Sequence, residues 1–254
     1  MIVLNTDLDN TIIFSYKHNI GEPKLNVEIY QGREISYITE RTFELLQKVR
    51  KKMLIVPTTT RTMEQYKRIE LGIGDFKYAL VSNGGILLID GESDEEWYRE
   101  SLVIVEESKE KMEKALFLLE NENNRIFEVR FINDLFLFTK CNQPENVVLT
   151  LKKQLNTNLV DVFNNGVKVY VVPKQLNKGK AVERLKEKLK PEYVIAAGDS
   201  EFDISMVLSA DKGIVPYGFK EQYDITSDIF EMSDKMLFSE SLLEECIKTK
   251  VEQK

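Results

Sequence analysis

The chain of 254 residues is poor in the residue types that build several common kinds of site. Its two cysteines, Cys141 and Cys246, lie far apart in the sequence. So few cysteines exclude a disulfide framework and a cysteine-rich zinc site. The single histidine, His18, excludes any mechanism that needs two, and one histidine without a local partner is weak evidence for a base or a metal ligand.

Long hydrophobic runs and an excess of positive charge are also missing. No apolar stretch approaches the ~20 residues of a membrane-spanning helix, and no signal peptide precedes the first apolar run. We therefore expect no membrane partner and a cytoplasmic location. The chain has 35 Lys and Arg against 42 Asp and Glu, a formal net charge of −7. This balance argues against a nucleic-acid partner, although a locally positive site for a small anion is compatible with it.

The overall composition is that of a globular protein, with 43% hydrophobic and 30% charged residues. A chain of 254 residues is near the length at which single cores begin to divide. One large domain, or a core with a smaller second domain, are both compatible with this length.

In the first third of the chain, short apolar runs typical of strands alternate with segments whose apolar residues have helical spacing. Helical stretches begin at Thr39 and cover 63–71. This β-α-β-α-β order predicts parallel strands. The predicted strands are 2–6, 53–56 and 78–81. Residues 15–38 form a long insertion after the first strand, in which a turn around Gly32 predicts a hairpin and a candidate flap over the strand ends.

The middle of the chain has a different order of elements. Consecutive strands without a helix between them indicate an antiparallel sheet with helices on one face. The strands are predicted over 97–105, 126–131, 135–139, 159–163 and 167–172, and the helices over 108–121 and 145–155. We therefore predict that residues 86–172 are a separate α+β domain, inserted into an α/β domain made of 1–85 and 173–254. The two halves of the insert form a weak internal repeat.

The first predicted strand ends in two carboxylates. Asp7 and Asp9 follow it, on the same side of the extended chain. Two carboxylates this close repel each other unless a positive charge lies between them, and Mg²⁺ takes one or two protein carboxylates. The alternative is a simple turn that stops the strand, because Asp and Asn favour turns.

Other predicted strand ends carry complementary groups. Thr59 belongs to a run of hydroxyls ahead of the helix at 63–71, where helix amides favour an anion. The alternative there is helix capping by Thr60 or Thr62 without a ligand. Two carboxylates follow the strand predicted at 193–197, and one lysine follows a loop; these residues are Asp199, Asp203 and Lys178. Carboxylates indicate a cation, and lysine with hydroxyls indicates an anion, so the set predicts a phosphate ester beside Mg²⁺.

These segments resemble the four motifs of a haloacid dehalogenase superfamily phosphatase of the Cof-like branch, subfamily IIB, with a second-type α/β cap. Nearly the whole chain takes part in the resemblance. The matching segments are Asp7-Leu-Asp9-Asn-Thr11, Thr59-Thr-Arg61, Asn177-Lys178-Gly-Lys180 and Gly198-Asp199-Ser-Glu-Phe-Asp203, with Asn83-Gly84 ahead of the insert. The resemblance implies an α/β, Rossmann-like core with a parallel sheet and an inserted α+β cap.

The resemblance also implies a role for each carboxylate. Asp7 would be the nucleophile that forms an aspartyl-phosphate. Asp9 would be the general acid and then the general base, and its backbone carbonyl would bind Mg²⁺. Asp199 would join Asp7 and Asp9 as a ligand of Mg²⁺, and Asp203 would orient the waters of the metal or Lys178 from a second shell.

The remaining predicted residues contact the substrate. The phosphoryl oxygens would be held by Thr59, Thr60, Arg61 and Lys178. Asn83, Gly84 and Arg130 are candidates for other substrate contacts, as are Asn133 and Lys140, although a solvated surface position is equally compatible with the cap residues. Two positions depart from the pattern of the branch: Thr60 replaces a glycine and Phe202 replaces an asparagine.

The resemblance predicts a Mg²⁺-dependent phosphatase for a small phosphorylated metabolite, such as a sugar phosphate. Dehalogenases of the superfamily lack an acid at the position of Asp9, because a halide leaves without a proton. The alternatives are a phosphomutase with the same covalent chemistry and a non-catalytic module that binds phosphorylated metabolites. The sequence specifies neither the particular ester nor an oligomeric state, since one fold carries many functions.

Overall fold

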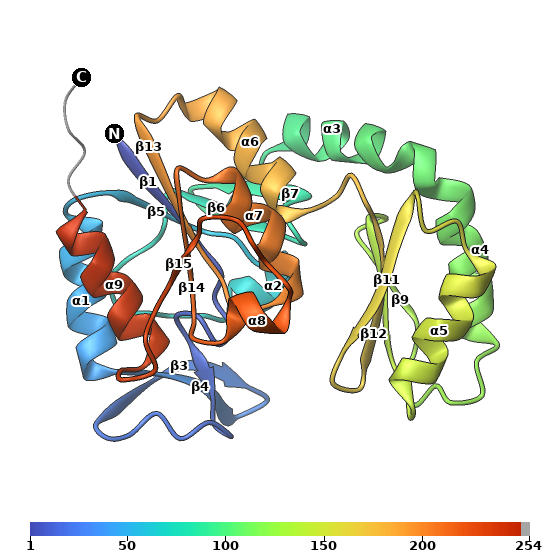
Figure 1. The fold of residues 1–254 in the computed structure, drawn as a ribbon, viewed down its shortest axis with the longest axis horizontal. Coiled ribbons are helices and arrows are strands. Elements are labelled where there is room, and N and C mark those ends of the chain that lie inside the picture. The colour runs from blue at the N-terminus through green and yellow to red at the C-terminus, as the bar shows by residue number, and fades with distance from the viewer. Residues whose placement is uncertain (250–254) are drawn as a thin grey trace. The chain divides into compact units, whose positions relative to one another are not determined.

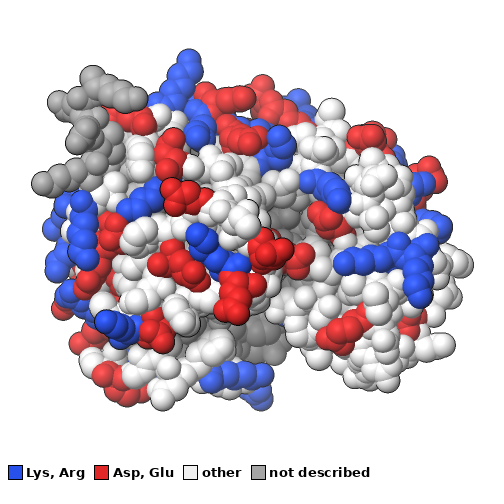
Figure 2. Space-filling view, viewed as in Figure 1, with Lys and Arg blue, Asp and Glu red and all other residues white. Residues whose placement is uncertain are grey.

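The computed structural model describes residues 1–249 (Figure 1). It divides into two compact units, one made of Met1–Ser93 with the chain from Lys178 onward, and one made of Asp94–Asn177. Residues 250–254 of the predicted core range lie outside the described part. Among the described residues, no helix has the length and apolar character needed to cross a membrane. On the face in Figure 2, Lys and Arg are interspersed with Asp and Glu.

The first unit is built on a five-stranded parallel sheet of order β15-β14-β13-β1-β5. Its strands are β1 (Ile2–Thr6), β5 (Leu54–Pro57), β13 (Tyr193–Ala197), β14 (Lys212–Val215) and β15 (Phe230–Glu231). Thr6 pairs with both Pro57 and Ala197 in the register of the sheet. The carboxyl ends of β1, β5 and β13 therefore lie side by side, at the edge where open α/β sheets bind ligands.

Helices cover both faces of this sheet, which explains why its strands are continuous apolar runs. In Figure 1, α1 (Glu40–Arg50) and α9 (Phe238–Lys248) lie on one side, and α6 (Lys178–Leu189) and α7 (Ile204–Ser209) on the other. The first pair buries apolar residues against the sheet in one core cluster, which includes Leu45, Leu46, Val49, Leu242, Leu243, Leu4 and Ile195. The short elements η2 (Glu201–Asp203) and α8 (Phe219–Gln222) complete this part of the unit.

The predicted hairpin is confirmed and carries a third strand. The elements β2 (Phe14–Ser15), β3 (Lys24–Tyr30) and β4 (Arg33–Thr39) form an antiparallel sheet of order β2-β4-β3. Gln31 and Gly32 connect β3 to β4 with positive φ angles of 51° and 73°, the conformation that a tight two-residue hairpin turn requires. Thr39 then caps α1 by accepting a hydrogen bond from the backbone N–H of Thr42.

The strand predicted over 78–81 is present as β6 (Tyr78–Val81) and is parallel to the end of β5 as predicted, but it also shares a sheet with two strands that were not predicted. It forms an antiparallel sheet with β7 (Ile86–Ile89) and β8 (Glu92–Ser93), and a parallel bridge of Thr58 with Leu80 joins it to the end of β5. The chain reverses between β6 and β7 because consecutive residues from Ser82 adopt positive φ angles. This hairpin places 86–93 in the first unit, and residues 173–177 fall in the second, so the predicted boundaries at 86 and 172 are both displaced.

The helix predicted over 63–71 is much shorter in the structure. It is α2 (Met63–Tyr66), and Thr62 caps it in a reciprocal capping box with Gln65. Beyond α2, Ile69 forms an isolated antiparallel bridge with Glu28 of the hairpin sheet, so the backbone there is no longer helical. The predicted capping role of Thr62 is thus confirmed.

The second unit is an α+β domain, as predicted. Its four-stranded antiparallel sheet has the order β11-β12-β10-β9. The elements are α3 (Glu95–Val105), η1 (Glu106–Ser108), α4 (Lys109–Glu120), β9 (Arg130–Ile132), β10 (Phe136–Lys140), α5 (Pro144–Gln154), β11 (Val160–Asn165) and β12 (Lys168–Pro173). One core cluster joins α4 and α5 to one face of this sheet, through residues such as Met112, Leu151, Leu137 and Val171.

The strand predicted over 97–105 is wrong, because this segment is helix α3. Its β-branched residues favoured a strand, but Asp94 accepts hydrogen bonds from the backbone N–H groups of Glu96 and Trp97 and caps a helix. The buried residues Trp97, Ser101 and Val105 are spaced by four, which is the spacing of one helical face. Local capping and burial therefore outweigh the strand propensity.

Candidate active site

Asp7 lies directly after β1, in a buried group of charged residues. Its backbone N–H donates to the carbonyl of Ala197 at 2.8 Å and extends the sheet by one residue. Lys178, at the start of α6, donates from Nζ to Asp7 Oδ1 and to Asp203 Oδ1, both at 2.6 Å. The side chains of Lys178, Asp7 and Asp203 are 1%, 8% and 0% exposed. Water therefore screens these ion pairs little.

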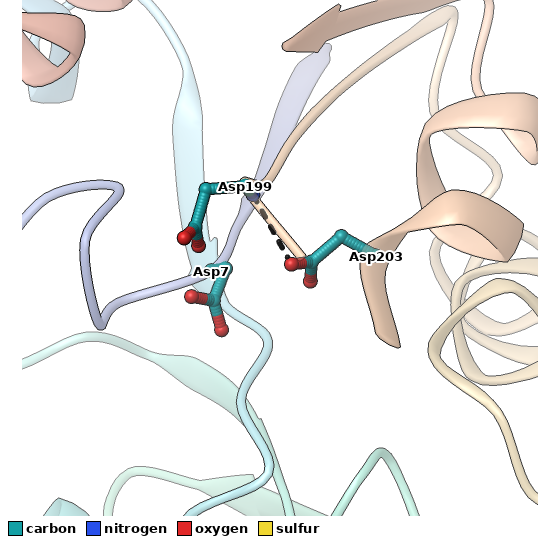
Figure 3. A group of neighbouring side chains, drawn as sticks. All are labelled: Asp7, Asp199 and Asp203. Atoms are coloured by element: carbon teal, nitrogen blue, oxygen red, sulfur yellow. Dashed lines mark hydrogen bonds between the residues drawn. The ribbon is translucent and has the colours of Figure 1, made fainter. Parts of the chain in front are cut away.

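Asp199 and Asp203 follow β13, and Figure 3 shows them grouped with Asp7. Asp203 Oδ2 accepts from the backbone N–H groups of Asp199 and Ser200, at 3.2 and 3.0 Å, and from the Ser200 hydroxyl at 2.7 Å. Asp199 Oδ1 accepts from the Thr11 hydroxyl at 3.2 Å. A Cβ at Gly198 would clash with the carboxyl carbon of Asp203, so this close approach requires glycine.

Burial and mutual repulsion perturb the acidity of this group. Burial raises the pKa of Asp7 well above its usual range, Lys178 opposes the increase, and Asp203, Asp199 and Asp9 add to it. Burial also raises the pKa of Asp199 to about 7, with Asp203 adding to the increase and Lys178 opposing it. For Lys178, burial alone would lower the pKa, but attraction to Asp203 and Asp7 outweighs burial and raises it. The lysine is therefore cationic at neutral pH.

The donor set fits a hard divalent cation. One carboxylate oxygen from each of Asp7, Asp199 and Asp203 lies within 4.8 Å of the others. When ionised, these carboxylates and the single ammonium of Lys178 leave an excess of negative charge in a buried place, which a cation with oxygen ligands would offset. The metal ligands predicted from the sequence were Asp7, Asp199 and the backbone carbonyl of Asp9, so the carboxylate cluster of the structure has Asp203 in place of Asp9.

Thr59 lies at the same edge of the sheet, two residues after the end of β5. It is fully buried, and its hydroxyl accepts from the backbone N–H of Arg61 at 3.1 Å. Its carbonyl accepts from the backbone N–H of Asn83 at 3.0 Å, which brings the turn after β6 beside it. Asn83 and Gly84 have φ angles of 59° and 84° in this turn. Thr60 is half-buried.

Asp9 has different surroundings from Asp7, although the two are one residue apart. Its side chain is 50% exposed. Arg61 donates to it twice, from Nε to Oδ2 and from Nη2 to Oδ1, both at 2.7 Å. The same guanidinium donates from Nη1 to Glu28 Oε1 at 2.8 Å. Arg61, predicted to bind phosphate, thus contacts two carboxylates in this structure. Burial alone would lower the pKa of its guanidinium, but the contacts with Asp9 and Glu28 outweigh burial and raise it.

Arg130 belongs to the second unit, on β9. Its guanidinium donates to Glu128 Oε1, at 2.7 Å from Nε. It lies over the ring of Phe127, 4.8 Å from the centroid, and Lys140 approaches the same ring at 4.9 Å. The backbone carbonyl of Asn133 accepts from the Tyr98 hydroxyl at 3.2 Å. The predicted substrate contacts of this unit stay predictions.

The structure brings together Asp7, Lys178, Asp199 and Asp203 as the sequence predicted, because the ends of parallel strands meet at one edge. Sequence reasoning assigned no role to Glu28, Arg68 or Ser36, which surround Arg61 and its partners. In an alternating strand pattern, a glutamate is expected to face solvent. The sequence pattern therefore gave no reason to place Glu28 or its partners in the site. Thr11 lies within the first motif, yet its contact with Asp199 was not predicted either.

Comparison with known families assigns the chain. The model of the haloacid dehalogenase-like hydrolases matches residues 87–215, about half of the chain, including Lys178 and Asp199. The chain therefore belongs to the haloacid dehalogenase-like hydrolases, and the predicted resemblance to this superfamily is confirmed. No curated protein matches the chain.

Solved structures share the fold over nearly the whole length. Sucrose-phosphatase from Synechocystis sp. PCC6803, solved with sucrose and phosphate, is 17% identical with a TM-score of 0.68, and the match covers 96% of each chain. The subclass IIB sugar phosphatase BT4131 is 16% identical with a TM-score of 0.58, over 97% of this chain and 100% of that one. The phosphatase BT1666 from Bacteroides thetaiotaomicron is 13% identical with a TM-score of 0.57, over 96% and 93%. At these identities the likeness establishes the α/β core with an inserted α+β unit.

Proposed function

We propose that this chain is a Mg²⁺-dependent phosphoric monoester hydrolase of the Cof-like branch, which cleaves a small phosphorylated metabolite through an aspartyl-phosphate. The observation that carries the proposal is the buried contact of Asp7 with Lys178, beside Asp199 and Asp203, at the carboxyl ends of parallel strands. This arrangement offers a nucleophilic carboxylate, a fixed cation for an incoming anion and acidic ligands for a metal. The similar sugar phosphatases support a sugar phosphate as the substrate class.

In the first step, an oxygen of Asp7 attacks phosphorus and the bond from phosphorus to the ester oxygen breaks. Lys178 holds Asp7 in place and offers its positive charge to the phosphoryl oxygens. Thr59, Thr60 and Arg61 are the other proposed phosphate contacts. Asp9, protonated with one of its two Arg61 contacts released, gives its proton to the departing alkoxide, which would otherwise leave as a strong base.

In the second step, Asp9 takes a proton from water as the water attacks phosphorus of the aspartyl-phosphate. Inorganic phosphate leaves and Asp7 is regenerated as a carboxylate. Mg²⁺, held by Asp7, Asp199 and the Asp9 carbonyl, supplies charge neutralisation for the phosphoryl group when bound. Asp203 keeps Lys178 in position, because it accepts from Nζ and is itself held by the turn at Ser200.

The second unit is proposed to be the cap that selects the substrate, because sites in this fold need to exclude water while the reaction proceeds. Arg130 in that unit, and Asn83 and Gly84 in the core, are the proposed contacts to the rest of the ester. Arg130 is 48% exposed and pairs with the carboxylate of Glu128, so an anionic group is the chemistry that its guanidinium favours in a substrate.

The test is phosphate release from a broad panel of phosphate esters, with Mg²⁺ and with a chelator, using Asp7→Asn as the blank. The proposal predicts release that depends on Mg²⁺ and is absent from the blank. Phosphoryl return to an isomeric product, without free phosphate, would instead identify a phosphomutase. Tight binding of an ester without turnover under any metal would identify a non-catalytic module.

A further inference from the structure

Glu28 is a buried carboxylate outside the four motifs, yet it belongs to the same network as Asp9. It lies in β3 of the hairpin sheet and is 1% exposed. The β3–β4 pairing shifts register on both sides of Glu28. Such bulges bend a strand and redirect a side chain. Here the side chain contacts groups of the first unit that lie beyond the hairpin sheet.

Three side chains donate to this carboxylate. Arg61 Nη1 and Arg68 Nε donate to Oε1, at 2.8 and 3.1 Å, and the Ser36 hydroxyl donates to Oε2 at 2.7 Å. Burial alone would raise the pKa of Glu28, but the hydrogen bonds from Arg61, Ser36 and Arg68 outweigh burial and lower it. A buried carboxylate with this many donors is held in one place, because any other position would leave it unpaired.

Arg61 is fixed in turn by its other edges. Its Nη1 also lies 3.4 Å from the carbonyl of Gln65, and its Nε and Nη2 form the two-point contact with Asp9. A planar guanidinium with hydrogen bonds on several edges has little freedom to rotate. The position of the Asp9 carboxylate is thus set by Arg61, and the position of Arg61 is set by Glu28.

We propose that Glu28 is a positioning residue for the reaction, which acts through Arg61 to hold Asp9 where it exchanges protons with the leaving group and with water. This inference rests on the proposed function and deepens it, since it gives the hairpin inserted at 15–38 a role in catalysis. Orientation of a catalytic group carries a large share of its effect, so a loosened Asp9 loses efficiency even when present.

The chemistry of the leaving group provides the test. An alkyl ester needs a proton from Asp9 when its P–O bond breaks, whereas p-nitrophenolate leaves without one. The value of kcat/KM reports events up to the first irreversible step. For Glu28→Gln, we expect kcat/KM for the best alkyl ester of the panel to fall about tenfold or more. The value for p-nitrophenyl phosphate is expected to stay within about twofold of the unmodified protein.

Arg68→Met is the matched control. It removes a second cation from the same oxygen of Glu28 and leaves the contact from Glu28 to Arg61 and Asp9. Its ratio of alkyl to aryl kcat/KM is expected to equal that of the unmodified protein. Should Glu28→Gln fail to fold, Glu28→Asp, which keeps the charge and withdraws it from Arg61, is expected to lower the same ratio.

A measurement without turnover separates this inference from the proposed function. The shifts in the urea denaturation midpoint are compared for Glu28→Gln, Asp9→Asn and the double variant. If Glu28 acts on Asp9 through Arg61, the double shift differs from the sum of the single shifts, because each single variant leaves Arg61 one carboxylate and the double variant leaves it neither. Additive shifts, or equal losses on both esters, overturn the role of Glu28. If the unmodified protein cleaves neither ester, the proposed function fails. The comparison of urea midpoints for the single and double variants then tests by itself whether Glu28 is coupled to Asp9.

Discussion

Two regions of the candidate site contrast in their surroundings although they begin one residue apart. The region of Asp7 is buried, and its single cation, Lys178, is shared with Asp203. The Asp9 side chain is half-exposed, and its cation, Arg61, is shared with the buried Glu28. Each carboxylate is therefore one of a pair that shares a cation, but only the first pair is joined by a third carboxylate, Asp199.

The difference teaches that environment, and not spacing, separates the two roles. Burial disfavours the charged form of Asp7, and a metal ion bound beside it would favour that form. Such an environment suits a group that must bind a metal and attack phosphorus. Solvent access suits a group that exchanges protons with a leaving group and with water. Paired carboxylates with unlike surroundings are a recurrent way of dividing acid, base and nucleophile.

The largest predicted effect is on Asp7. Asp7→Asn removes the attacking carboxylate but keeps the shape of the buried region, so turnover of every ester is expected to fall by at least about 10⁴-fold. Phosphate release measured on the purified variant checks this. Turnover of the variant within about tenfold of the unmodified protein would show that Asp7 is not the nucleophile.

Asp9→Asn should separate the two regions by leaving group. We expect kcat/KM for an alkyl ester to fall by about 10²–10⁴-fold, because the departing alkoxide receives no proton. The value for p-nitrophenyl phosphate is expected to change much less. Equal losses on both esters would mean that Asp9 acts on binding or on the metal and not as an acid.

Lys178→Met tests the buried region through stability. The change leaves Asp7 and Asp203 without their shared cation, and breaking a buried ion pair costs about 3–5 kcal/mol of unfolding free energy. Urea denaturation of the metal-free protein at pH 7 measures it. The control is Lys180→Met, an exposed lysine paired with Glu183, for which a change within about 0.5 kcal/mol is expected. A similar small change at Lys178 would contradict the assigned burial.

The smallest predicted effect concerns pH and Mg²⁺. Burial raises the pKa of Asp199 to about 7 in the metal-free protein, and the metal binds the carboxylate form. Apparent Mg²⁺ affinity is therefore expected to rise at least about tenfold per pH unit below 7, because the pKa of Asp7, another proposed ligand, is raised as well. Because the folded protein holds the proton more tightly than the unfolded chain, metal-free stability should fall as pH rises from about 4 to 7. Calorimetric titration and urea denaturation at several pH values check both trends, and a flat affinity would contradict the metal site.

The buried region could be predicted from the sequence, and the exposed one only in part. Asp7, Asp199 and Lys178 follow apolar runs or open a helix, and parallel strands bring their ends together without any detailed packing. Arg61 was found as part of a motif, but its partner depends on a register shift in β3 that turns Glu28 inward. No local pattern encodes such a shift, because the bulge depends on contacts with Arg61 and Arg68 that are distant in sequence.

The same limit explains the misassigned segment over 97–105. Its β-branched residues predicted a strand, whereas the preceding Asp94 caps a helix whose buried face contains Trp97 and Ser101. Propensity is a weak guide where capping and burial both favour the other structure. The direction of β6 was predicted correctly, but its hairpin partner β7 was assigned to the insert, because Asn83-Gly84 was interpreted as a family motif and not as the Asn-Gly signal of a hairpin turn.

The most direct test of the division between Asp7 and Asp9 is a rapid-quench experiment on Asp9→Asn with p-nitrophenyl phosphate and Mg²⁺. This variant can form the aspartyl-phosphate but lacks the base for its hydrolysis. The account predicts a burst of about one p-nitrophenolate per protein molecule, with a phosphoryl group on the peptide that contains Asp7. Absence of a burst, or a phosphoryl group on another peptide, would contradict the account.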